Sequence, residues 1–162
     1  MKEFYEKRIP LNCSCEHFDV DMSFWYTRKE IIYNDCIFYI DQKTKTACFI
    51  DTKYEVEELN IPNNIFYNNQ NYTVTHILGG FSNLKSLKSI QFNPKSQIKK
   101  ILYSSFNKCL ITKITIIPSI TEINEFVFSE CNNLKIVEIS QDSELEFIGK
   151  FAFYSTPIEN IF

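Results

Sequence analysis

Three side chains near the N-terminus, Cys13, Cys15 and His17, have the residue types of a metal site. Structural zinc sites take four ligands, and their paired cysteines are usually separated by two to four residues. Here one residue separates the two cysteines, and the neighbouring sequence offers no evident fourth ligand. We therefore predict no metal and no cofactor. Zinc analysis of the purified protein and of its Cys15→Ala variant would test the alternative.

The other ionisable side chains lack the partners that catalysis requires. A cysteine nucleophile needs a histidine base placed beside it by the fold, and His17 and His76 are the two histidines of the chain. His76 lies in a strand-like stretch, which favours a structural or surface role. Asp142, Glu144 and Glu146 are spaced two apart and read as a solvated acidic edge. We predict no catalytic residues, and hence that the protein is not an enzyme.

The composition excludes several classes of protein. The 162 residues include only 3 glycines, too few for a glycine-rich phosphate-binding loop. The formal net charge is −3 and the densest basic run, Lys95–Lys100, is short, so we predict no nucleic-acid partner. No apolar run approaches the roughly 20 residues that span a bilayer. The N-terminus lacks the apolar segment of a secretory signal, which makes the cytoplasm the default location.

An internal repeat organises the second half of the chain. Four segments each carry an aliphatic residue, a second aliphatic three residues later, and a phenylalanine four or five residues further on. The second aliphatics and the phenylalanines are Ile77, Ile101, Ile123 and Ile148, and Phe81, Phe106, Phe128 and Phe153. A unit of this length cannot bury its apolar side alone. We therefore expect the units to stack into a solenoid with the phenylalanines at the centre of its core.

A second column of residues alternates between apolar and polar types. Its copies are Leu59–Ile61, Ile90–Phe92, Ile114–Ile116 and Val137–Ile139, and Ile161 begins a fifth. This period of two is typical of a short, half-buried strand. Stacking the units would place these strands about 4.8 Å apart in a continuous ladder.

The six cysteines add little chemistry to this pattern. Without a secretory signal, reduced thiols are the expectation. Cys109 and Cys131 both follow a core phenylalanine by three residues, so they occupy equivalent positions of neighbouring units. Free cysteine behaves as a small, often buried apolar residue. We therefore predict two stacked, buried thiols here, rather than a disulfide or a metal site.

In the stretch from Ile111 to Cys131, the strand Ile114–Ile116 is followed by a proline and then by the isoleucine, phenylalanine and cysteine positions of the repeat. This stretch resembles a complete unit of the BspA-like leucine-rich repeat family. This family includes surface-antigen-like proteins of anaerobic bacteria and protozoan parasites. Leu145–Phe153 is similar to the second half of the same unit. The glycine of the family pattern is present only as Gly149.

The repeat and the resemblance together predict a mainly β, right-handed leucine-rich-repeat solenoid of about four rungs, with short irregular or 3-10 convex segments. We expect residues 1–30 to form an N-terminal extension, partly packed or mobile. Residues 31–53 are expected to form a capping β-hairpin, and residues 54–162 the solenoid, which ends within a fifth rung. The hairpin would cover the exposed strand edge of the first rung. Phe24, Trp25 and Tyr26 are expected to pack against this cap.

We predict a non-catalytic protein–protein interaction or adhesion-type module that presents an extended strand face. Eight outward positions form the candidate interaction face: Glu58, Asn60, Ser89, Gln91, Lys113, Thr115, Glu138 and Asn160. Their mixed polar chemistry suits recognition of a protein, and it equally suits a solvated sheet that binds nothing. The resemblance implies adhesion or host-protein binding at the cell surface, in contrast to the default location.

The alternative is a structural or truncated repeat protein. The sequence stops just as a fifth strand begins, which leaves Ile158, Ile161 and Phe162 at an open end of the core. Open strand edges favour association. End-to-end self-association through these three residues is therefore the competing prediction, and light scattering of the full chain and of a chain lacking residues 158–162 would test it.

Overall fold

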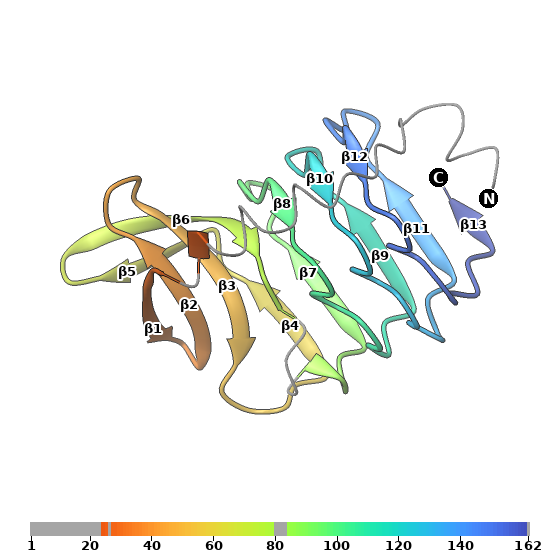
Figure 1. The fold of residues 1–162 in the computed structure, drawn as a ribbon, viewed down its shortest axis with the longest axis horizontal. Coiled ribbons are helices and arrows are strands. Elements are labelled where there is room, and N and C mark those ends of the chain that lie inside the picture. The colour runs from red at the N-terminus through yellow and green to blue at the C-terminus, as the bar shows by residue number, and fades with distance from the viewer. Residues whose placement is uncertain (1–23, 26, 80–83, 162) are drawn as a thin grey trace.

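The strands of the repeat stack side by side along the length of the molecule (Figure 1). The computed structural model describes residues 24–25, 27–79 and 84–161. One column of strands follows the alternating segments of the sequence: β4 (Glu58–Ile61), β7 (Ser89–Phe92), β9 (Lys113–Ile116), β11 (Ile136–Ile139) and β13 (Asn160–Ile161). β4 pairs with β7, and β11 pairs with β9 and β13, in each case in parallel. The fold is thus the mainly β solenoid that the repeat predicted.

The opposite side of the solenoid is a single larger sheet, sheet A. Its strands are β1 (Lys29–Tyr33), β2 (Cys36–Asp41), β3 (Thr46–Thr52), β5 (Asn64–Tyr67), β6 (Gln70–Ile77), β8 (Lys100–Ile101), β10 (Glu122–Ile123) and β12 (Phe147–Ile148). They run in the order β1-β2-β3-β6-β8-β10-β12, with β5 paired to β6. The parallel register aligns the four isoleucines of the repeat, Ile77, Ile101, Ile123 and Ile148.

One continuous hydrophobic core fills the space between sheet A and the other column of strands. Phe106, Phe128 and Phe153 form a stack at its centre. The first two ring centroids are 5.6 Å apart with planes inclined by 12°, and the second two are 5.2 Å apart at 17°. The predicted phenylalanine column is confirmed for these three residues; Phe81 lies outside the described residues.

The solenoid has about five turns, where the sequence indicated about four. The sequence also indicated the start of a fifth rung, and β13 is its strand: Asn160 and Ile161 pair in register with Ile136 and Val137 of β11. Two residues are enough to extend the ladder because the preceding turn fixes their position: the Glu159 N–H donates to the Lys135 carbonyl at 2.9 Å.

The N-terminal strands extend sheet A and leave the other strand column uncovered. β2 and β3 pair antiparallel around the polar turn, and β3 then pairs in parallel with β6. The expectation that this hairpin covers the strand edge of the first rung therefore holds for sheet A alone. β4, the first strand of the other column, is paired only with β7 among the described strands. The sequence could not reveal this because each turn of a solenoid exposes two edges.

Two further hairpins were not predicted from the sequence. β1 pairs antiparallel with β2, and β5 with β6. Their two-residue turns are Asn34–Asp35, with φ of 47° and 58°, and Asn68–Asn69, with φ of 48° and 58°. Positive φ at both central residues defines the tight turn whose twist matches that of paired strands, and asparagine and aspartate tolerate it. The Asn-Asp and Asn-Asn pairs in the sequence were the signals from which these two turns could have been predicted.

Trp25 packs on the outward side of sheet A, where only 1% of its surface is exposed. Its neighbours are Cys48, Ile50, Leu78 and Leu102, which form a second, smaller cluster. The predicted packing of Trp25 against the N-terminal strands is confirmed. Tyr26 and residues 1–23 lie outside the described residues.

Candidate functional site

The outward side chains of β4, β7, β9, β11 and β13, here called the strand face, form two columns. In one column Glu58 pairs with Ser89, and Ile136 pairs with both Lys113 and Asn160. In the other, Asn60 pairs with Gln91, and Thr115 pairs with Glu138. The eight candidate residues are all exposed or half-buried, whereas the alternate residues of the same strands face the core.

Ion pairs and hydrogen bonds connect neighbouring strands of the strand face. The Lys113 Nζ lies 2.7 Å from the Glu138 Oε1, and the Thr115 hydroxyl donates to the Glu138 Oε2 at 2.9 Å. These donors, Lys113 first and then Thr115, lower the pKa of Glu138 below its ordinary value. Because all three groups are solvent-exposed or nearly so, the pairing contributes little to folding. Its effect is to fix the side chains in position.

Two more ion pairs lie where the strands begin. The Lys88 Nζ is 2.7 Å from the Glu57 Oε1, and the Lys135 Nζ is 2.9 Å from the Glu159 Oε1. Each pair again joins neighbouring turns. The charges along this side of the molecule therefore largely neutralise one another. Glu58 differs, because it makes no ion pair with any described residue.

The strand face is divided between β7 and β9. The two strands lie next to each other (Figure 1), but no ladder joins them in the described part of the chain. One hydrogen bond crosses just before them, from the Leu110 N–H to the Leu87 carbonyl at 2.8 Å. The Ser89 hydroxyl beside this break is buried and finds no partner among the described residues. The extended face predicted from the sequence is therefore two adjoining surfaces.

Ile136 is a member of the strand face that sequence reasoning missed. It pairs with Lys113 and with Asn160, and it is half-buried. The signal was available, because Ile136 directly precedes the inward-facing Val137 and must therefore face outward. An apolar side chain between two polar ones gives this column a contact point that excludes water.

The stacked cysteines behave as buried apolar residues. The Cys109 and Cys131 thiols are free and donate to the carbonyls of Leu84 and Phe106, at 3.0 and 3.1 Å. Burial raises the pKa of Cys131 to about 12, and burial followed by the nearby Cys131 raises that of Cys109 further. Thiols in this state are protonated at neutral pH and are poor nucleophiles and metal ligands.

The remaining candidate groups are dispersed. His76 is half-buried on β6, with its ring centroid 5.1 Å from that of Trp25 and its Nδ1 2.8 Å from the Thr75 hydroxyl. Glu144 is exposed and pairs with Lys99 at 3.1 Å. No group of three potential metal ligands occurs within the part of the chain that the structure describes. Cys13, Cys15 and His17 lie outside that part.

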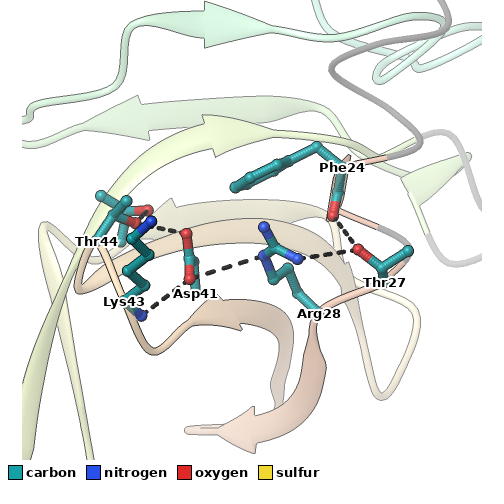
Figure 2. A network of polar contacts seen from close by, with 7 residues as sticks. Phe24, Thr27, Arg28, Asp41, Lys43 and Thr44 are labelled. Atoms are coloured by element: carbon teal, nitrogen blue, oxygen red, sulfur yellow. Dashed lines mark hydrogen bonds and ion pairs between the residues drawn. The ribbon is translucent and has the colours of Figure 1, made fainter.

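A polar network joins the segment before β1 to the turn between β2 and β3 (Figure 2). The Asp41 carboxylate accepts hydrogen bonds from the Lys43 N–H at 3.0 Å and the Thr44 hydroxyl at 2.9 Å, and Arg28 lies 3.7 Å away. Burial alone would raise the pKa of Asp41, but these donors and the Arg28 charge more than offset it and lower the pKa. The Arg28 guanidinium also covers the Phe24 ring at 3.9 Å. The network supports structure at the N-terminal end.

The residues proposed for self-association lie at the C-terminal end of the core. Ile158 and Ile161 are half-buried and pack against it. Phe162 lies outside the described residues. No helix in the described part of the chain is long and apolar enough to cross a membrane.

Parallel ladders on two sides of one core, repeated turn by turn with stacked phenylalanines, define a leucine-rich-repeat solenoid. Residues 45–162 match the family described as "BspA type Leucine rich repeat region", in six copies. The chain belongs to this family, as its repeat pattern predicted. No curated protein matches the sequence.

Solved structures agree on the fold. A leucine-rich repeat protein from Bacteroides capillosus is 18% identical, with a TM-score of 0.66, and the match covers 82% of this chain and 96% of that one. A leucine-rich repeat protein of T. pallidum is 16% identical, with a TM-score of 0.59 and coverage of 82% and 71%. The pneumococcal vaccine antigen PcpA is 17% identical, with a TM-score of 0.58. That match covers 82% of this chain but only 46% of the antigen, so this chain spans less than half of its length.

Proposed function

We propose that the protein is a non-catalytic interaction module that binds a protein partner through the strand face. The observation that carries the proposal is the parallel register of β4 with β7, and of β9 with β11 and β13, which brings side chains from five separate segments onto two adjoining surfaces. Solenoids commonly bind partners through surfaces assembled in this way.

The chemistry of the strand face suits recognition of a polar surface with a small apolar contact. Lys113, Thr115 and Glu138 hold one another in place, so a partner would order few additional side chains on binding. Ile136 supplies the apolar contact, and Asn60 and Gln91 supply exposed amide groups on β4 and β7.

The proposal includes adhesion at the cell surface. The likeness to a pneumococcal vaccine antigen supports this location, because an antigen used in this way is accessible from outside the cell. Locating the tagged full-length protein in its native cell tests this part of the proposal. If the protein is confined to the cytoplasm, the proposed adhesion role is refuted, whereas the proposed role as an interaction module still stands.

Crosslinking from defined positions tests the binding face. A photo-reactive amino acid replaces Gln91 or Thr115 on the strand face, and Lys150, an exposed residue on the turn side, serves as the control position. We expect products of one defined mass from the first two positions and none from the third. Equal products from all three positions would contradict the proposal.

The same crosslinking experiment distinguishes binding of a partner through the strand face from the alternative of end-to-end self-association. A product of twice the mass of the chain, formed from a photo-reactive group at Ile161, would favour end-to-end stacking. A monomer by light scattering before and after the deletion would exclude that alternative.

A further inference from the structure

β4 has an open edge on the side away from β7. Glu57, which directly precedes β4, accepts hydrogen bonds from the N–H groups of Lys88 and Ser89 with its carbonyl. Its backbone polar groups, and those of Leu59, therefore face β7. Because these groups alternate along a strand, the N–H and C=O groups of Glu58 and Asn60 face the open edge. No described strand pairs with them there.

A small pocket of about 110 Å³ adjoins this edge. Three consecutive residues of β4 form one wall. The other walls come from the β1–β2 turn and the segment after β3, and the full lining is Asn34, Asp35, Cys36, Thr52, Tyr54, Val56, Glu58, Leu59 and Asn60. A cavity of about 150 Å³ can hold a benzene molecule. The pocket therefore has room for a single long, unbranched side chain.

The surroundings of the pocket are acidic. Asp35 and Glu58 line it and form no ion pair with the described residues, while Glu55 lies nearby and accepts a hydrogen bond from Ser86. Burial and then the Asp35 charge raise the pKa of the Cys36 thiol, so the Asp35 carboxylate lies close to this wall. Lys53 also lies nearby: its ammonium group is 5.2 Å from the centroid of the Tyr54 ring and forms no ion pair with the described residues.

We propose that an extended, basic segment of a partner protein adds to the edge of β4 as a further strand and places a lysine or arginine side chain in this pocket. The edge supplies main-chain hydrogen bonds, and the pocket and its carboxylates supply selectivity. Two copies of this edge do not pair with each other, because Glu58 and Asp35 would meet their own like charges. The inference rests on the proposed function only in taking a protein as the partner. It adds a second surface and a partner chemistry.

The test uses two libraries of acetylated, amidated hexapeptides against the full chain, one with lysine fixed at the third position and one with glutamate there. We expect selection to enrich peptides from the lysine library. Bound peptide should slow the hydrogen exchange of the Glu58 and Asn60 amides, and N-methylation of its backbone should abolish binding. Equal enrichment of both libraries, or binding without that protection, would overturn the proposal.

Variants separate the edge from the charges. Asn60→Pro removes an N–H that no described strand uses, and proline is tolerated at such an edge position. We expect the variant to fold, as judged by circular dichroism, and to lose binding at least about tenfold. Glu58→Gln and Asp35→Asn should each weaken binding about two- to fivefold, whereas Glu144→Gln, an exposed acid elsewhere, should not change it. If neither charge variant weakens binding, the basic specificity is refuted.

The outcomes for the two proposals are independent. Crosslinking from Gln91 and Thr115 in the native cell reports on the strand face and does not require the edge of β4. A chain that crosslinks through the strand face but binds no peptide at the edge would refute this inference alone.

Discussion

Left-handed backbone positions recur at fixed places in the rungs of Phe106, Phe128 and Phe153, and residues other than glycine fill them. They lie two residues before and two residues after each of these three phenylalanines: Ser104 and Lys108, Phe126 and Glu130, and Phe151 and Ser155, with φ between 55° and 63°. Such a conformation costs an ordinary residue on the order of 1 kcal/mol. The scarcity of glycine in the sequence therefore leaves strain at the turns of the solenoid, which the stacked core must offset.

Replacing Ser155 by glycine should relieve one of these positions. Ser155 has φ of 55° and is exposed, and no described residue hydrogen-bonds to its side chain. We expect Ser155→Gly to be about 1 kcal/mol more stable than Ser155→Ala, because both remove the hydroxyl and only glycine removes the Cβ. Urea unfolding of the two variants measures the difference. An alanine variant as stable as the glycine variant would contradict the strain.

Two buried aspartates should respond to pH in opposite directions. Burial raises the pKa of Asp51, and the Thr52 N–H, which donates to its carboxylate at 2.8 Å, offsets this only in part. A raised pKa in the folded state means that ionisation opposes folding above that pKa. We therefore expect Asp51→Asn to raise the free energy of unfolding at pH 7, with a gain that shrinks as the pH falls towards about 4.

Asp41 provides the matched control for that prediction. Its pKa is lowered, so its ionised form stabilises the fold above the unfolded pKa of about 3.9, and this contribution is lost as the pH falls through the folded pKa. Asp41→Asn should therefore lower the stability at pH 7 and have less effect in acid. Urea unfolding at pH 7 and at acidic pH measures the stability of both variants. Equal responses would show that neither environment acts as described.

At the scale of elements, the phenylalanine stack is the main source of stability of the rungs that contain it. Phe128 is fully buried, with Phe106 and Phe153 stacked on its two sides. We expect Phe128→Ala to cost about 3–5 kcal/mol, since it removes a large buried side chain and both ring contacts. Phe66→Ala is the control, because that ring is 57% exposed, and it should change stability by less than about 1 kcal/mol. Similar losses for both variants would argue against a stack-centred core.

What the sequence could predict depended on how local each signal was. The strands around Ile114 and Val137 and the inward isoleucines follow from short periods that repeat along the chain. The hairpin of β5 and β6 required recognising Asn68–Asn69 as a tight turn, which is a weaker signal than Asn-Gly. For the candidate face, the outward positions followed from the same period of two. Their grouping did not, because pairing between turns depends on contacts distant in sequence.

At the scale of the whole molecule, the two sides of the solenoid differ in continuity. Sheet A runs without interruption from β1 to β12, whereas the other column of strands is broken between β7 and β9. In a solenoid each turn is stabilised mainly by its neighbours. The break therefore marks the place where one side of the molecule can open while the other side holds the turns together.

Hydrogen exchange of two equivalent residues tests this asymmetry. The Ser89 N–H donates to Glu57, so the next N–H, that of Ile90, faces β9 across the break; the N–H of Ile114 faces β11 within a continuous ladder. We expect the Ile90 amide to exchange at least about tenfold faster than that of Ile114. Equal rates would show that β7 and β9 pair in solution.

The same measurement locates a bound partner, because Gln91 and Thr115 lie on opposite sides of the break. A partner that contacts both residues should slow the exchange of the Ile90 amide. A partner confined to β9, β11 and β13 should leave that exchange rate unchanged.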